Sequence, residues 1–141
     1  MSATLSYRTE FESCYIQDSE LHAHRYKIEV TVDGERRYHT TGQIIDYKEL
    51  ATYVKSICPD KTFLTGMDST PSEQAVAVCM KACSVPVMER PHQLTIESFC
   101  ESLARELQDL LDRHAFGVRV VEVKLRETND SYATWIVPAT S

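Results

Sequence analysis

The chain has 141 residues, a formal net charge of −6 and an isoelectric point near 5.3, which fits one domain of modest size over residues 1–141. An acidic chain without a basic run is not expected to bind nucleic acid. No apolar stretch approaches the roughly 20 residues of a membrane-spanning helix. The polar start Met1–Thr4 is unlike a signal peptide, so we expect a cytoplasmic protein with no membrane partner.

The five cysteines are consistent with a reducing compartment. Their number is odd and no two of them have CxxC spacing, the pattern of many metal and redox sites. Cys79, Cys83 and Cys100 fall on apolar stretches with helical spacing, where a reduced thiol behaves as a small hydrophobic group. We therefore expect free thiols rather than disulfides.

The first part of the chain predicts strands followed by a helix. Residues 5–16 and 24–33 are strand-like, with a polar connection between them. Asp33-Gly34 is a hairpin turn signal that leads into an extended run at residues 37–42. Asp46, with Glu49 three residues later, predicts a capping box at the start of a helix that ends before Pro59.

The second part predicts two more helices and two strands. A helix begins at Thr70 with a proline at its first position and ends near Ser84, and residues 85–88 are extended. Thr95 caps a third helix, whose leucine stripe runs to about Arg113. Strands follow at 118–127, with a bulge near Val120-Val121, and at 133–137. This order of elements predicts an α+β fold with a sheet backed by helices. Four residues are expected to be buried together: Val30, Leu103, Leu107 and Val123.

Two histidines stand at the start of the second predicted strand. Side chains alternate between the faces of a strand, so His22 and His24 point the same way. Two neutral imidazoles on one face could bind one Zn²⁺ at about 2.0–2.1 Å. A chance pairing is the alternative, because the HxH spacing is short and common.

Five segments resemble, in order along residues 8–136, the 6-pyruvoyl-tetrahydropterin synthase / 6-carboxy-tetrahydropterin synthase family. His22–Tyr26 resembles its HGHxY motif, and residues 42–50 resemble the segment that opens its first helix. Residues 59–64 are similar to LDHxxL, residues 94–98 to PTAEN, and residues 127–135 to the terminal ET…WAxY. The resemblance implies the tunnelling fold, a four-stranded antiparallel sheet with helices on one face, assembled as a homotrimer or homohexamer into a barrel.

The resemblance also implies a zinc ion held by three histidines. His22 and His24 match two of these ligands, but the third position is Tyr15. A neutral phenol with a pKa of about 10 is a poor zinc ligand unless the metal deprotonates it. Three other side chains are alternatives for the third ligand: Asp18, Glu20 and His39.

The position of the family's catalytic cysteine falls on Asp18, and Cys14 lies four residues too early to replace it. Glu20 resembles a branch of the family in which an ExHGH motif supplies a glutamate as the base. That branch is associated with cleaving the pterin side chain to a hydroxymethyl product. A carboxylate beside a metal usually has a lowered pKa, which favours its unprotonated form but makes it a weaker base. The alternative for Glu20 is a solvated loop acid.

Of the remaining positions that carry function in the family, some match in this sequence and one is replaced. Asp60 matches the family's catalytic aspartate, but Lys61 replaces its histidine partner and would bind a substrate phosphate or lie on the surface. Glu127 matches the glutamate that anchors the pterin ring by accepting its N–H protons, with Thr128 beside it. Thr95 has a counterpart near the pterin, and residues 66–93 would line or cover the pocket.

The resemblance therefore implies a divergent, metal-assisted lyase that cleaves a carbon–oxygen or carbon–carbon bond. Its substrate would be a dihydropterin of the dihydroneopterin triphosphate type, or a related purine-like ring, in pterin, folate-type or queuosine-type deazapurine biosynthesis, with Glu20 as base. The alternative is a repurposed, non-catalytic pterin- or purine-binding subunit that has lost the zinc site. Metal content of the purified protein would discriminate the two.

Overall fold

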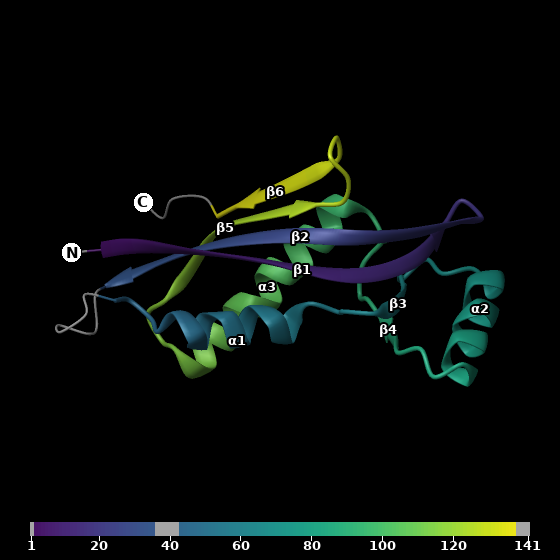
Figure 1. The fold of residues 1–141 in the computed structure, drawn as a ribbon, viewed down its shortest axis with the longest axis horizontal. Helices are drawn as coiled ribbons and strands as arrows, with labels where there is room; N and C mark the ends of the chain where they lie inside the picture. Colours follow the sequence, from purple (N-terminus) through teal and green to yellow (C-terminus); the bar gives the residue numbers. More distant parts are fainter. Residues whose placement is uncertain (1, 36–42, 138–141) are drawn as a thin grey trace.

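The computed structural model describes residues 2–35 and 43–137 (Figure 1). Within these ranges one sheet has six strands: β1 (Ser2–Gln17), β2 (Glu20–Glu35), β3 (Thr62–Thr65), β4 (Val87–Glu89), β5 (Arg119–Arg126) and β6 (Tyr132–Ile136). The same ranges contain three helices: α1 (Tyr47–Ile57), α2 (Pro71–Ala82) and α3 (Ile96–His114). None of the helices in the described ranges has the length and apolar character needed to cross a membrane.

A long hairpin of β1 and β2 forms the centre of the sheet (Figure 1). The two strands pair from Ser2↔Glu35 to Gln17↔Glu20, so the connection is only two residues long. Asp18 and Ser19 both have positive φ, 53° and 63°, as a two-residue type I′ turn requires. The predicted polar connection is therefore shorter than expected, and residues 20–23 belong to β2.

The sheet is larger than the predicted four-stranded antiparallel sheet. Its strand order is β4-β3-β1-β2-β5-β6, in which β1, β2, β5 and β6 form the expected antiparallel unit. The short strands β3 and β4 extend this unit through parallel pairing. Sequence periodicity missed β3 because three of its four residues are buried and do not alternate with polar ones.

The predicted hairpin turn at Asp33-Gly34 is wrong, because β2 continues through both residues to Glu35. Gly34 pairs with Ala3 on β1, so the long ladder replaces the local turn. A Cβ atom on Gly34 would lie 3.0 Å from the carbonyl oxygen of Gly117, and glycine therefore permits a close approach of two backbones here. The extended run expected at residues 37–42 lies outside the described residues.

The local signals for helix starts are largely confirmed. The Thr70 side chain accepts from the Glu73 N–H and the Glu73 side chain accepts from the Thr70 N–H, which completes the capping box of α2. Asp46 caps α1, but Glu49 accepts a hydrogen bond from the Tyr53 hydroxyl at 2.6 Å instead of closing a box. Thr95 caps α3 by accepting from the Ser98 N–H.

The predicted bulge in β5 is also present. Thr31 on β2 pairs with Glu122, whereas the next residue, Val32, pairs with Val120. Val121 is therefore the extra residue, at the place where the sequence indicated a change of face.

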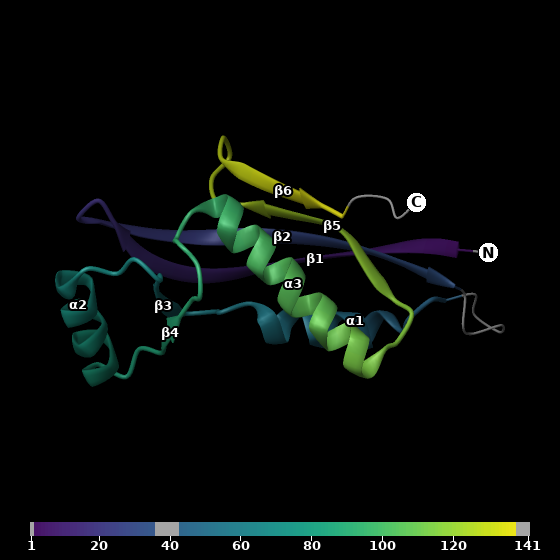
Figure 2. The same ribbon diagram turned by 180° about the vertical axis from the view of Figure 1, so that it is seen from behind.

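Helices α1 and α3 cover one face of the sheet, and α2 lies with β3 and β4 at the far end of the β1–β2 hairpin (Figure 2). The stripe of α3 packs on the sheet because its apolar side chains recur at helical spacing. The four residues predicted to be buried together belong to one core cluster, each at most 1% exposed: Val30, Leu103, Leu107 and Val123.

We expect Leu107→Ala to lower the free energy of unfolding by about 2–5 kcal/mol, because a fully buried leucine leaves a cavity between α3 and the sheet. Val78→Ala on the exposed face of α2 is the matched control, with an expected change within about 0.5 kcal/mol. Urea denaturation of both variants measures the difference. Equal losses in the two variants would contradict this packing of α3.

Candidate metal centre and active site

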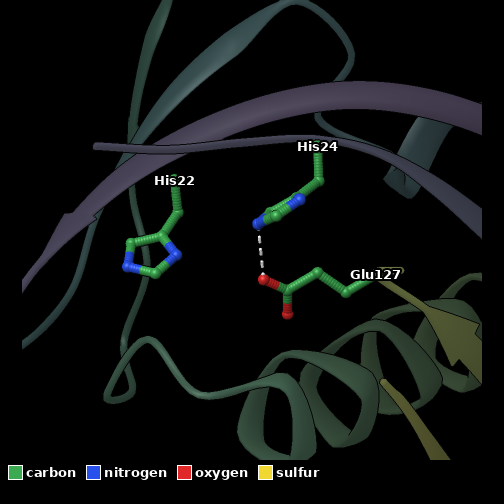
Figure 3. Close-up of side chains that lie close together, drawn as sticks. All are labelled: His22, His24 and Glu127. Carbon is green, nitrogen blue, oxygen red and sulfur yellow. Dashed lines mark ion pairs between the residues drawn. The ribbon is translucent and has the colours of Figure 1, made fainter. Parts of the chain in front are cut away.

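Two histidines of β2 and one glutamate converge on the helix-covered side of the sheet (Figure 3). His22 and His24 project from the same face of β2, and Glu127 extends toward them from the end of β5. One ligand atom of each residue lies within 4.8 Å of the others, and His24 Nε2 is 2.7 Å from Glu127 Oε1. The antiparallel pairing of β2 with β5 therefore joins residues about a hundred positions apart in the sequence.

The backbone at Glu127 is held by the turn that follows β5. The N–H groups of Glu127 and Thr128 both donate to the carbonyl oxygen of Ser131, at 2.9 and 3.2 Å. The exposed Thr128 accepts from the Asp130 N–H through its hydroxyl, at 3.3 Å. These bonds fix the point from which the Glu127 side chain reaches the histidines.

Tyr15 joins the cluster from β1. It lies directly opposite His22 in the strand register, with the two rings stacked at a centroid distance of 5.1 Å. Its hydroxyl donates to Glu127 Oε1 at 3.1 Å. Burial, and then the nearby Glu127 carboxylate, raise the pKa of Tyr15 to about 12. The phenol is therefore a protonated hydrogen-bond donor at neutral pH.

Two buried polar atoms at this place have no hydrogen-bond partner within the described residues, His24 Nε2 and Ser13 Oγ. The short distance from His24 Nε2 to Glu127 Oε1 thus does not have the direction of a hydrogen bond. Ser13 is the β1 residue directly opposite His24, so its side chain lies on the same face. Because buried polar atoms are nearly always partnered, the cluster fits a cation that would accept the imidazole lone pair.

The candidate catalytic acids lie at the tip of the hairpin. Glu20 is the first residue of β2 and is exposed, on the face that also carries His22. Asp18 is exposed in the two-residue turn. A hollow of about 650 Å³ beside this turn is lined by Asp18, by Thr70 at the start of α2 and by Thr95 at the start of α3.

Asp60 and Lys61 lie at a different place. The Asp60 carboxylate accepts from the Glu12 N–H at 2.8 Å, and the Lys61 N–H donates to the Glu12 carbonyl oxygen. Lys61 is exposed, has a φ of 52°, and lines a second hollow of about 440 Å³, whose lining also includes Cys14 and His24. Both residues therefore bond to the backbone of β1 at Glu12, just before β3 begins.

Three cysteines have raised thiol pKa values, which disfavours the reactive thiolate form at these positions. Cys14 points to the opposite face of β1 from Tyr15, and burial raises the pKa of its thiol above the usual value. Burial also raises the pKa of Cys58 to about 12 and that of Cys100 to about 11. All five cysteines are free, as expected.

The structure thus brings Tyr15, His22, His24 and Glu127 together and leaves Asp60 and Lys61 elsewhere. His39, an alternative third ligand, lies outside the described residues. Sequence reasoning missed the contact between Glu127 and His24. The antiparallel pairing of β2 with β5 could have indicated this contact, because it places the start of β2 beside the end of β5.

Tyr15 is expected to make stability decrease at high pH. Between pH 10 and about 12 the folded protein keeps the Tyr15 proton while the unfolded chain loses it, so unfolding becomes more favourable as pH rises. Tyr15→Phe should reduce this loss by up to about 1.4 kcal/mol per pH unit. Urea denaturation at a series of pH values measures the slope, and Tyr47→Phe at an exposed position is the control. Identical slopes in wild type and Tyr15→Phe would contradict the assigned environment.

Comparison with known proteins identifies the family of this chain. The profile of the 6-pyruvoyl tetrahydropterin synthase family matches residues 4–136. The solved structure of 6-pyruvoyltetrahydropterin synthase from Plasmodium vivax has a TM-score of 0.71 at 16% identity, covering 96% of this chain and 97% of that one. An uncharacterized protein from Wolinella succinogenes has a TM-score of 0.72 at 16% identity, covering 96% and 98%.

The Plasmodium falciparum 6-pyruvoyl tetrahydropterin synthase has a TM-score of 0.62 at 17% identity, covering 95% of this chain and 96% of that one. Two further similar structures are of the Plasmodium vivax enzyme with alanine or cysteine in place of a catalytic glutamate. No curated protein matches the sequence. The family profile spans nearly the whole chain, and the fold agrees with that of a solved member. This protein therefore belongs to the 6-pyruvoyl tetrahydropterin synthase family.

Proposed function

We propose that the protein is a divergent, metal-assisted lyase that acts on a dihydropterin or a related purine-like ring. The observation that supports this most is the convergence of His22, His24 and Glu127 within 4.8 Å, with His24 Nε2 buried and lacking a hydrogen-bond partner among the described residues. Zinc suits a donor set of two imidazoles and a carboxylate. When bound, it would supply Lewis-acid stabilisation of charge on a substrate oxygen.

Glu20 is the proposed general base. It lies two residues before His22 on the same face of β2, and it is exposed, so its carboxylate is open to a substrate bound over the histidines. A catalytic glutamate in the similar Plasmodium vivax enzyme supports this assignment. The role of Glu20 would be to take a proton from the substrate side chain, a step that a positioned carboxylate can accelerate.

The ring of the substrate is proposed to bind between Glu127 and the start of α3. Glu127 Oε1 is engaged with Tyr15 and His24, and Oε2 is the oxygen that would accept a ring N–H. Thr95 borders Tyr15 in a small internal gap and also lines the larger hollow beside Asp18. The segment that begins α2 would then form one wall of the substrate site, with Thr128 near the ring.

The second candidate function is a non-catalytic pterin- or purine-binding subunit. The observation that favours it is the use of the Asp60 carboxylate in a bond to the Glu12 backbone, together with Lys61 in place of a proton-transferring histidine. A protein of this kind would bind a pterin without converting it. Measuring binding and turnover on the same preparation separates the two functions.

We also propose a cytoplasmic homotrimer or homohexamer. In the described sheet β4 and β6 are the edge strands, and Tyr132 and Ile136 on β6 are each more than 60% exposed. An open edge with apolar side chains is a surface that another strand can cover. Light scattering at micromolar concentration is expected to give three or six times the chain mass of 16.1 kDa, and a monomer would contradict the assembly.

Glu20→Gln is expected to lower the turnover of dihydroneopterin triphosphate by about 10²–10⁴-fold, because the amide cannot accept the substrate proton. Pterin affinity should change little, since Glu20 is not proposed to contact the ring. Glu10→Gln, at an exposed position on the same hairpin, is the matched control and should leave both quantities unchanged. Product analysis by mass spectrometry measures turnover, and isothermal titration measures affinity.

Wild-type protein that binds pterins tightly and never converts them would favour the non-catalytic alternative. Turnover that is equal in wild type and Glu20→Gln would show that another residue is the base. Failure to bind any dihydropterin would contradict the proposed substrate class.

A further inference from the structure

We infer that Glu127, and not Tyr15, supplies the third protein ligand of the metal site through its Oε1 atom. The site would then be a centre of two histidines and one carboxylate. This inference rests on the metal site of the proposed function and deepens it, because it changes the donor set and the charge of the site. It also assigns a different role to Tyr15, which occupies the sequence position of the family's third histidine.

The positions of the three donor atoms carry the inference. Neighbouring ligand atoms of a tetrahedral Zn²⁺ are about 3.3 Å apart when each bond is about 2.0–2.1 Å. His24 Nε2 and Glu127 Oε1 are 2.7 Å apart, and no pair among the donor atoms of His22, His24 and Glu127 exceeds 4.8 Å. Small side-chain rotations therefore bring all three atoms to bonding distance from one point (Figure 3).

Hydrogen bonding within the cluster supports the same donor set. His24 Nε2 is buried beside Oε1 without forming a hydrogen bond, which is the arrangement of two lone-pair donors that face a shared cation. The backbone of Glu127 is fixed by its N–H bond to Ser131, so the carboxylate is held at this place by the fold itself.

Tyr15 has the geometry of a positioning residue. Its O–H donates to Glu127 Oε1 at 3.1 Å, and its ring lies at 8° to the plane of the His22 ring. One side chain thus restrains the orientation of two of the ligands, which is the role of hydrogen-bonded groups around metal ligands.

The carboxylate changes what the metal can do. Three neutral histidines leave a Zn²⁺ site with a net charge of +2, whereas two histidines and a carboxylate reduce it to +1. A less positive site polarises a substrate oxygen less strongly. The same donor set occurs in hydrolytic zinc sites and in non-haem iron sites that keep open positions for other molecules.

Zn²⁺ titration of the full-length protein, after removal of metal with a chelator, tests the inference. Wild type should bind one Zn²⁺ per chain without the ultraviolet difference band of a tyrosinate, because Tyr15 keeps its proton. Glu127→Gln should weaken binding by at least a hundredfold, and Tyr15→Phe by less than Glu127→Gln. The double variant Tyr15→His/Glu127→Gln should regain most of the affinity, since it restores three neutral imidazoles. Glu122→Gln, on the opposite face of β5, is the matched control and should bind as wild type does.

Circular dichroism and thermal unfolding establish that each variant is folded before titration. A tyrosinate band on Zn²⁺ binding, with affinity kept in Glu127→Gln, would overturn the inference and leave a metal-assisted lyase in place. Wild type that binds no Zn²⁺ would overturn it as well. Zn²⁺ binding as expected in a protein that neither binds nor converts dihydropterins would support the donor set while contradicting the proposed function.

Discussion

The unbroken pairing of β1 with β2 is the constraint on which the rest of the structure depends. Sixteen consecutive residue pairs fix which side chains of both strands face the helices, because a strand alternates its faces at every residue. The two-residue turn keeps this alternation in register at the hairpin tip. Tyr15, His22 and His24 therefore share one face, and this face is also the one that packs on α3.

The core and the site are parts of one surface. Along β2 the histidines are followed on the same face by Tyr26, which is 1% exposed and stacks against Phe11 and packs edge-on against Phe99. Polar side chains thus begin where the apolar packing ends, near the start of α3. Side chains at such a boundary gain rigidity from the core that packs on one side of them.

Local signals in the sequence predicted the features that depend on neighbouring residues. The cap residues Thr70 and Thr95 predicted where α2 and α3 begin, and the change of face at Val121 predicted the bulge. The strand β3 and the path of β2 through Gly34 could not be predicted this way, because both depend on pairing with β1. The two histidines were indicated by spacing and by family resemblance. The approach of Glu127 to His24 depends on the pairing of distant strands, which local periodicity does not contain.

The bulge at Val121 has a consequence for the chemistry at the other end of β5. Before the bulge Val118 and Val120 face the core, and after it Val123 and Leu125 do, so the inward positions change from even to odd numbers. Because inward positions after the bulge are odd-numbered, Glu127 points toward the histidines. If β5 kept Val121 but paired with β2 without a bulge, Arg126 would turn inward and Glu127 outward, placing a cation where the carboxylate now stands. The uptake of Val121 as a bulge thus sets the sign of the charge that β5 presents to the two imidazoles.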